Sequence, residues 1–444
     1  MALVCSFLFT VSAYAEYTPL RLSGAGKDMY AVQEDDVIYA APKLLELGKR
    51  WKVEAKGQSV FVRPNAPGTK AETEVEIPVR EIDRKQYIDF SFFAKQAGID
   101  YTLNRKKNKL SVKPGKNKKI RKQEKGGKKK GGSGRVLLWD PDMEFEPLPD
   151  GFTAEAGRRW IAPEWGSYSS LKKGRKSGLD YIKKLKKADF GILPLVHNDF
   201  DPDATGKFLH DSEAGEKLTD YLTAFSTVYD FDGWNIDFEN MYEKDRDAFT
   251  SFMKVLSDKL HQSGKESTVN ITVYNEGSPT WSLCYDRRAL AEFCDYEVVM
   301  GYDQTSAYSR YAGSVAAADW LDENLQVLLK QIPADRMILG LPLYTRVWRG
   351  NPGAVHSDVL TVKYTEPFLQ RHHAGKVWDD QTKQYISRFT ENGTPVIVWL
   401  EDERSLQAKI DLIHKYKLSG MAFWRIGFEK DGLFRPLEKA YAKG

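Results

Sequence analysis

Within the stretch YDFDGWNIDFENMY, residues 229–242, the eight residues 232–239 hold three acidic side chains and one amide: Asp232, Asn235, Asp237 and Glu239. Because side chains alternate along a strand, a barrel strand here puts Asn235, Asp237 and Glu239 on its inward face, with Glu239 nearest the carboxyl end. Polar groups on an otherwise apolar strand are costly to bury unless they bond one another or a ligand. The spacing therefore indicates acid–base chemistry at one end of a strand. A satisfied buried polar cluster is the structural alternative.

The chain after residue 134 alternates apolar stretches with helical patterns. Phe249, Phe252, Met253, Leu256 and Leu260, for example, keep a helical period. Eight such strand–helix units favour an α/β fold, the (β/α)8 TIM barrel. The long gap before the last strand predicts an inserted α+β subdomain between strands 7 and 8. The predicted strands are 135–139, 160–165, 190–196, 233–239, 269–274, 296–303, 337–344 and 420–426.

The polar stretch resembles the DxxDxDxE signature of glycoside hydrolase family 18, the chitinase-like family. Asp232, Asn235, Asp237 and Glu239 fall on its four positions. Three further segments resemble family motifs in the same order: MGYD (300–303), LPLYTRVW (341–348) and GMAFWRIGFE (420–429). The segment 341–348 has Thr345 where the family has glycine. The resemblance covers about residues 133–444.

The resemblance implies a retaining, substrate-assisted hydrolysis in which the 2-acetamido group of the sugar attacks its own anomeric carbon. Glu239 would be the general acid and later the general base. Asp237 would hold the acetamido N–H, and Tyr302 would align the acetamido oxygen. Trp424 would form the apolar floor of the subsite, with Asp232 bonding backbone. The remaining predicted substrate contacts are Asp303, Tyr344, Arg346 and Trp348.

The departure from the family pattern is Asn235, where typical chitinases have aspartate. An amide does not titrate, and our hypothesis is that it donates a hydrogen bond to Asp237 and keeps that carboxylate ionised. The variant NIDFE resembles bacterial cell-wall and spore-cortex N-acetylglucosaminidases, which implies peptidoglycan as substrate. A chitinase acting on N-acetylglucosamine oligomers and a non-catalytic, lectin-like relative are the alternatives.

The sequence predicts that residues 16–112 form a separate, duplicated α+β domain. Segments 37–62 and 87–112 superpose at an offset of 50 residues, and each reads as a short helix ending at glycine followed by a hairpin. They resemble the copper amine oxidase N-terminal-like (stalk) domain of exported bacterial wall proteins. The segment contains no histidine, so we expect no copper and interpret it as a wall-attachment or spacing module.

The segment 113–134 is rich in lysine and glycine and lacks an apolar period, which predicts a flexible linker. Its positive charge favours an anionic wall polymer as partner, and a solvated spacer is the alternative. The apolar residues 1–15 end in Ala-Tyr-Ala, which predicts a secretory signal and a secreted or cell-wall-associated protein. Cys284 and Cys294 then form either a disulfide or two free thiols.

The composition, at 41% hydrophobic and 29% charged with a net charge of +4, is that of a globular protein. Its 12% aromatic content suits sugar stacking as well as core packing. His372 and His373 are the only clustered histidines, and the sequence has no HExxH or Cys–His ligand spacing. We therefore expect no metal and no other cofactor. We also expect a monomer that does not bind nucleic acid.

Overall fold

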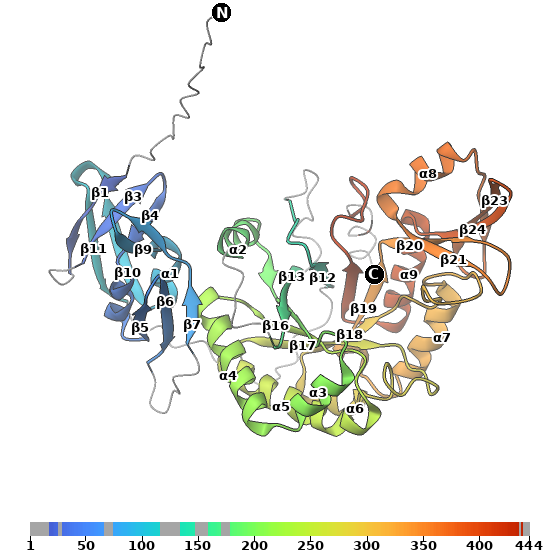
Figure 1. The fold of residues 1–444 in the computed structure, drawn as a ribbon, viewed down its shortest axis with the longest axis horizontal. Helices are drawn as coiled ribbons and strands as arrows, with labels where there is room; N and C mark the ends of the chain where they lie inside the picture. The colour runs from blue at the N-terminus through green and yellow to red at the C-terminus, as the bar shows by residue number, and fades with distance from the viewer. Residues whose placement is uncertain are drawn as a thin grey trace, which may run out of the picture. The chain divides into compact units, whose positions relative to one another are not determined.

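The computed structural model describes residues 17–24, 29–65, 74–115, 134–146, 159–169, 178–434 and 437. The chain divides into two compact units, Met1–Lys118 and Lys119–Gly444, whose elements are labelled in Figure 1. The predicted signal, 1–15, and almost all of the predicted linker, 113–134, lie outside the described residues. Among the described helices, none has the length and apolar character needed to cross a membrane.

The first unit contains three small sheets. The largest has the strand order β1-β3-β4-β9-β8, and the other two have the orders β5-β6-β7 and β10-β11-β2. Its strands are β1 (Thr18–Pro19), β2 (Arg21–Ser23), β3 (Ala31–Glu34), β4 (Val37–Ala40), β5 (Trp51–Lys56), β6 (Ser59–Pro64), β7 (Val75–Ile77), β8 (Arg80–Ile82), β9 (Lys85–Asp89), β10 (Ile99–Asn104) and β11 (Lys109–Pro114).

The two halves of this unit repeat one pattern. The 3-10 helix η1 (Pro42–Gly48) precedes the β5–β6 hairpin, and the α-helix α1 (Phe90–Gln96) precedes the β10–β11 hairpin, where a short 3-10 turn, η3 (Arg105–Lys107), separates the strands. Gly48 and Gly98 meet where the halves touch: a Cβ on Gly48 would lie 1.7 Å from the Ala97 carbonyl oxygen. Gly98 also has a φ of +75°, so both helix ends require glycine.

The second unit is a closed barrel of eight parallel strands, which confirms the predicted fold class. Each neighbouring pair is parallel, the β12–β13 pairing closes the ring, and the short β14 adds an edge pairing to β13. The eight barrel strands are β12 (Arg135–Asp140), β13 (Arg159–Ser167), β15 (Leu195–His197), β16 (Gly233–Asp237), β17 (Glu266–Thr272), β18 (Tyr296–Met300), β19 (Met337–Pro342) and β25 (Gly420–Trp424), and the edge strand β14 is Gly191–Ile192.

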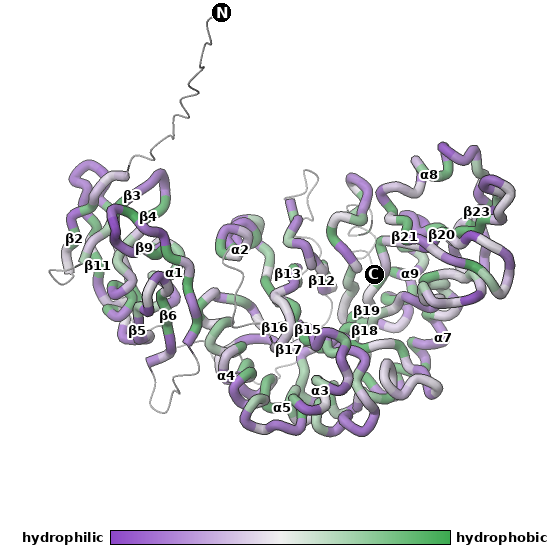
Figure 2. Tube along the Cα trace, in the orientation of Figure 1, coloured by the Kyte–Doolittle hydropathy of each residue, from purple (hydrophilic) through white to green (hydrophobic). Residues whose placement is uncertain are grey.

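Helices outside the strands cover the barrel (Figure 1). Helix α5 buries the five apolar residues whose period predicts it, and Figure 2 shows hydrophobic and hydrophilic residues alternating along α4 and α5. The side chain of Trp234 reaches α4, where its Nε1 donates to the Leu222 carbonyl at 2.9 Å. The helices are α2 (Gly178–Lys187), α3 (Pro202–Leu209), α4 (Ser212–Tyr229), η6 (Glu243–Asp245), α5 (Arg246–Gln262), α6 (Arg287–Phe293), α7 (Ala318–Leu328), η7 (Ala334–Arg336) and α9 (Glu403–Tyr416).

The predicted insertion between the last two barrel strands is present. It is an antiparallel sheet of order β21-β20-β24-β23-β22 with its own apolar core, which includes Val347, Leu360, Phe368 and Val398. Its elements are β20 (Tyr344–Arg349), β21 (His356–Thr361), η8 (Val362–Tyr364), α8 (Thr365–Arg371), β22 (Val377–Asp379), β23 (Gln384–Glu391) and β24 (Thr394–Leu400).

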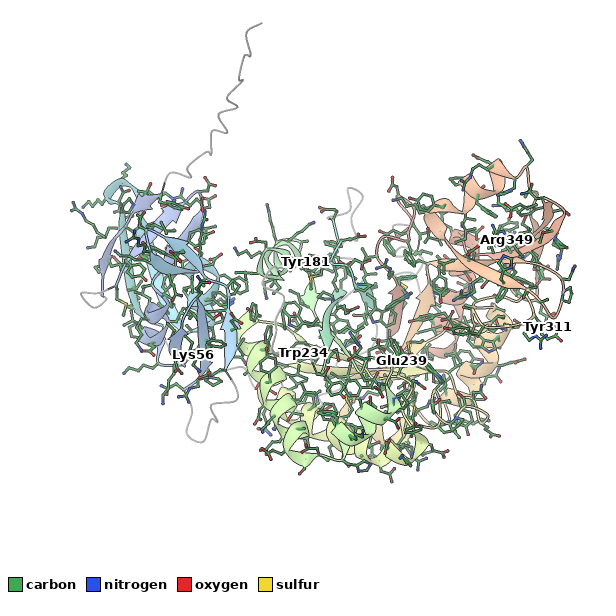
Figure 3. All side chains as sticks on the ribbon, in the orientation of Figure 1. Lys56, Tyr181, Trp234, Glu239, Tyr311 and Arg349 are labelled. Carbon is green, nitrogen blue, oxygen red and sulfur yellow. The ribbon has the colours of Figure 1, made fainter. Side chains whose placement is uncertain are left out.

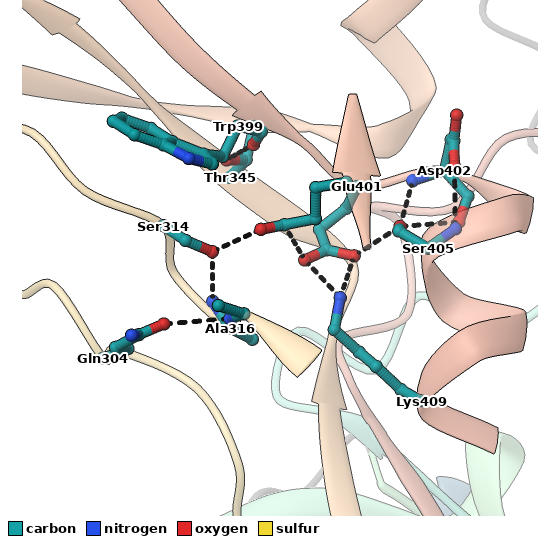
Figure 4. A network of polar contacts seen from close by, with 11 residues as sticks. Gln304, Ser314, Ala316, Thr345, Trp399, Glu401, Asp402, Ser405 and Lys409 are labelled. Carbon is teal, nitrogen blue, oxygen red and sulfur yellow. Dashed lines mark hydrogen bonds and ion pairs between the residues drawn. The ribbon is translucent and has the colours of Figure 1, made fainter. Parts of the chain in front are cut away.

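A buried ion pair joins this insertion to α9 (Figure 4). Glu401 follows β24, and Lys409 Nζ donates to both of its oxygens at 2.7 and 2.6 Å; both side chains are fully buried. Gln384 Nε2 and Ser405 Oγ also donate to Glu401, each at 2.7 Å. A buried pair is tolerated only with such additional hydrogen bonds, because both ions have lost their water.

We predict that Lys409→Met destabilises the second unit by about 3–5 kcal/mol, because it leaves the Glu401 carboxylate buried without its cation. Urea denaturation followed by tryptophan fluorescence measures the change. Lys415→Met is the matched control, since Lys415 pairs with Asp322 at 2.6 Å but is half exposed. The control should leave the midpoint nearly unchanged. Equal midpoints for the two variants would contradict the prediction.

Candidate active site

Glu239 lies just beyond the strand that presents the polar stretch. Strand β16 ends at Asp237, whereas the prediction extended it to Glu239. The Asn198 side chain holds the backbone of Glu239 on both sides: Nδ2 donates to its carbonyl at 2.7 Å, and Oδ1 accepts from its N–H at 3.0 Å. Glu239 therefore keeps a defined position beside the barrel mouth, and Figure 3 labels it there.

Asn235 does not bond Asp237 directly, which corrects the hypothesis made from the sequence. Its Nδ2 donates to Asn270 Oδ1 at 2.8 Å and to Thr268 Oγ1 at 2.9 Å. Asn270 Nδ2 in turn donates to Asp237 Oδ1 at 2.9 Å. Asn270 and Thr268 lie on β17, the strand next to β16. The amide at position 235 thus acts on Asp237 through a second amide.

These hydrogen bonds form an amide relay that runs from Trp139 through Asn235 and Asn270 to Asp237, and Trp139 sets its direction. Its Nε1 donates to Asn235 Oδ1 at 3.0 Å, and an indole N–H has no acceptor capacity. The Asn235 oxygen is therefore an acceptor, its nitrogen must donate to Asn270, and the nitrogen of Asn270 is left to donate to Asp237. All four side chains are at most 6% exposed, so reversing any link would bury unpaired polar atoms.

Burial raises the pKa values of both carboxyl groups, Asp237 and Glu239. It raises the pKa of Asp237 to about 6, although the hydrogen bond from Asn270 and the charge of His197 both lower it. Burial, followed by the charges of Asp237 and Asp303, raises the pKa of Glu239 well above its usual value. Of the two carboxyl groups, Glu239 therefore keeps its proton more strongly, and Asp237 ionises more readily.

Aromatic rings line the apolar side of the site. Trp139 contacts Tyr302 and Trp424, with ring centroids 6.4 and 5.8 Å apart. Tyr302 and Trp424 are only partly buried, at the edge of the barrel core. Burial raises the pKa of Tyr302 well above its usual value, so its hydroxyl remains a hydrogen-bond donor. The predicted residues Tyr302 and Trp424 thus meet beside the relay through Trp139.

Three of the predicted substrate contacts meet at Asp303, which follows β18, while Tyr344 and Arg346 lie on β20. Tyr344 donates its hydroxyl to Asp303 Oδ1 at 2.8 Å, and Arg346 Nη2 lies 3.6 Å from the same oxygen. Nε of Arg346 is buried without a hydrogen-bond partner among the described residues. Asp303 is exposed and has a φ of +56°. This group is therefore available to a ligand at the mouth.

Trp348 and Asp232 serve structural contacts instead. Trp348 is 1% exposed, and its Nε1 donates to the Gly313 carbonyl at 2.8 Å. It therefore supports a loop, and the prediction that it contacts substrate is wrong. Asp232 accepts from the Ile192 N–H at 2.9 Å, as expected for a backbone partner. Cys284 and Cys294 are both buried free thiols, so the disulfide alternative does not apply.

An exposed aromatic pair is formed by residues that follow β15 and β17, the two neighbours of β16, and it was not identified from the sequence. Phe200 follows β15 and Trp281 follows β17, and their rings stack with centroids 6.2 Å apart at 30°. They are 48% and 41% exposed. The Phe200 carbonyl accepts from Asn240 Nδ2 at 2.8 Å, one residue after Glu239. Exposed stacked rings of this kind can bind the apolar face of a sugar.

The site and fold agree with the comparison to known families. The model of Glycosyl hydrolases family 18 matches residues 163–429, and the chain belongs to this family of glycoside hydrolases. The matched region runs from β13 past β25, so it includes Asp237 and Glu239.

Similar proteins include two from Bacillus subtilis (strain 168). The uncharacterized glycosylase YvbX is 25% identical over 267 residues, which cover 59% of this chain and 77% of YvbX. The cortical fragment-lytic enzyme is 23% identical over 285 residues, covering 62% of this chain and 63% of the enzyme. The latter match therefore spans less than two thirds of the relative.

Two solved structures show the same fold. The chitinase from Chromobacterium violaceum has a TM-score of 0.60 at 24% identity, covering 69% of this chain and 98% of the chitinase. The Bacillus cereus spore cortex-lytic enzyme SleL has a TM-score of 0.61 at 18% identity, covering 70% of this chain and 75% of SleL.

We predict that Asn235→Asp moves the acidic limb of kcat/KM to higher pH. An ionised Asp cannot donate to Asn270, so the Asn270 amide turns, and Asp237 loses the hydrogen bond that lowers its pKa. Asp237 then ionises, and the enzyme becomes active, only at a higher pH. Asn324→Asp is the control, because Asn324 lies on α7 and donates to the Trp320 carbonyl at 2.8 Å, outside the relay. An unchanged limb and rate in Asn235→Asp would contradict this account.

We predict that Trp281→Ala raises KM for soluble N-acetylglucosamine oligomers by roughly two- to tenfold, the value of one lost aromatic stacking contact. Since stacking away from the reacting atoms binds ground and transition states alike, kcat should change little. Trp281→Phe should retain most of the affinity. Tyr101→Ala, an exposed aromatic of the first unit, is the control. A fall in kcat with unchanged KM would exclude this role.

Proposed function

We propose that this chain hydrolyses β-1,4-linked N-acetylglucosamine glycans with retention, and that peptidoglycan is its substrate. The observation that carries the proposal is the pair formed by Glu239 and Asp237: burial raises the pKa of Glu239 well above its usual value, while Asn270 donates a hydrogen bond to the Asp237 carboxylate. A general acid needs such a raised pKa to remain protonated near neutral pH.

In the proposed reaction, Glu239 protonates the glycosidic oxygen as the bond to the anomeric carbon breaks. The 2-acetamido oxygen of the same sugar forms the new bond to that carbon, so no second carboxylate attacks. Asp237 accepts from the acetamido N–H and stabilises its developing positive charge, while the Tyr302 hydroxyl donates to the acetamido oxygen. Glu239 then removes a proton from the incoming water.

The electrostatics predict how such a reaction depends on pH. Below about pH 6 the Asp237 carboxylate takes up a proton, and above the raised pKa of Glu239 the acid loses its own. Activity should therefore rise and fall around a maximum, and the two limbs belong to the coupled pair.

Peptidoglycan is favoured over chitin by the similarity to the cortical fragment-lytic enzyme and by Asn235 in the NIDFE stretch. A chitinase remains the second candidate, because the similar structures include a chitinase. A non-catalytic, lectin-like role is disfavoured by the presence of Glu239. We further propose that the chain is exported, with residues 16–112 as a stalk-like wall-attachment or spacing module and 113–134 contacting an anionic wall polymer.

We predict that the full chain releases new reducing ends from purified peptidoglycan faster than from chitin oligomers, with products ending in N-acetylglucosamine by mass analysis. Glu239→Gln should reduce kcat at least 100-fold, because the amide has no proton to give. Glu243→Gln, a nearby carboxyl outside the site, is the matched control. Faster cleavage of chitin supports the chitinase, and binding of oligomers without cleavage by the wild type supports the lectin. Hydrolysis that survives Glu239→Gln would contradict the acid assignment.

A further inference from the structure

A row of alternating charges crosses the barrel mouth on three strands. Glu164 lies on β13, His197 ends β15 and Asp237 ends β16. In the β15–β16 pairing His197 stands directly opposite Asp237, and β13 pairs with the other edge of β15. Residues in register on parallel strands project to the same side. The imidazole of His197 therefore lies between two carboxyl-bearing strands and beside Asp237.

Carboxylates face His197 from each of these elements. Its Nε2 is 3.6 Å from Glu164 Oε1, and its Nδ1 is 3.3 Å from Asp199 Oδ1 in the loop that follows β15. Asp237 faces it from β16. Nδ1 also accepts from the Asp199 N–H at 3.2 Å, so Nε2, which faces Glu164, is the nitrogen that carries a proton in this arrangement. A second proton on Nδ1 would face the Asp199 carboxylate. Its side chain is 20% exposed, so water screens these contacts only in part.

The relay through Asn235 supplies hydrogen bonds to Asp237 but no positive charge, which His197 can supply. Asn235 and Asn270 orient the Asp237 carboxylate, but neither amide carries charge. Asp237 is buried, and Glu239 lies close enough for the two carboxyl groups to influence each other. A buried carboxylate beside a second carboxyl takes up a proton unless a positive charge opposes it. His197 is the group on the neighbouring strand that becomes a cation when it is protonated.

We propose that His197, held by Glu164, is a positioning residue that keeps the Asp237 carboxylate ionised while Glu239 keeps its proton. The contact with Glu164, followed by the charges of Asp199 and Asp237, raises the pKa of His197. The charge of His197 in turn lowers the pKa of Asp237. His197 does not need to touch substrate for this role. The inference rests on the proposed function for its effect on catalysis, but the charge coupling itself does not.

The kinetic test compares His197→Gln and His197→Lys with the wild type. His197→Gln removes the cation, the pKa of Asp237 rises, and the acidic limb of kcat/KM should move up by about one pH unit. His197→Lys restores a positive charge and should move the limb back by at least half of that shift. His261→Gln removes a histidine that pairs with Asp295 at 2.8 Å elsewhere, and it should leave the limb in place. An unmoved limb in His197→Gln, or no recovery in His197→Lys, would overturn the proposal.

A second measurement is independent of activity. The pKa of His197, read by NMR of the full chain with labelled histidine, should fall in Asp237→Asn, because linkage between two charges is reciprocal. It should fall further in Glu164→Gln, since the contact with Glu164 is the largest cause of the raised pKa of His197. If the wild type cleaves no glycan, the proposed function fails while these shifts still support the coupling. A His197 pKa that is equal in Asp237→Asn and the wild type overturns the coupling whatever the activity.

Discussion

The indole N–H of Trp139 is the constraint on which the centre of the barrel depends. It can only donate, so it fixes which atom of Asn235 is the acceptor, and that choice passes through Asn270 to Asp237. The chain of donors ends on a carboxylate, the strongest acceptor available. A reversal would leave at least one buried polar atom without a partner, and that cost holds the network in one arrangement.

Barrel closure is what makes this relay possible. Trp139 and Asn235 are 96 residues apart in the chain, and Asn270 and Asp237 are 33 apart. Parallel pairing of β16 with β17, and of β15 with β16, aligns inward side chains at matching heights. Positioning the polar side chains therefore requires little additional loss of conformational entropy, because the strands that carry them are already ordered by the apolar residues around them.

The helices and strands could be predicted from the sequence, but the side-chain contacts between them could not. Hydrophobic period identified α5 and the barrel strands, because each period is a local property. Asn270, Asn198 and His197 were missed since each acts from a neighbouring strand or loop, and strand register cannot be read from one segment. The strand carrying the motif was drawn two residues too long for a related reason: alternation continues past Asp237, although ladder pairing does not.

Strand β20 explains both the successful and the unsuccessful predictions around the insertion. Its alternate residues Tyr344, Arg346 and Trp348 share one face, and all three contact the segment after β18: the first two meet Asp303, and the third meets the Gly313 carbonyl. On the other face, Val347 packs into the insertion core and Arg349, labelled in Figure 3, donates to Glu391 at 2.6 Å.

One face of β20 thus builds the insertion while the other holds a loop of the site. Trp348 belongs to the same row as the two side chains that meet Asp303, but it stands furthest along the strand, where the loop covers it. A motif matched by residue type does not distinguish these positions, because alternation assigns a face and not a depth. The insertion therefore acts on the site through the loop after β18 that it contacts. The Glu401–Lys409 ion pair joins the insertion to α9 of the barrel.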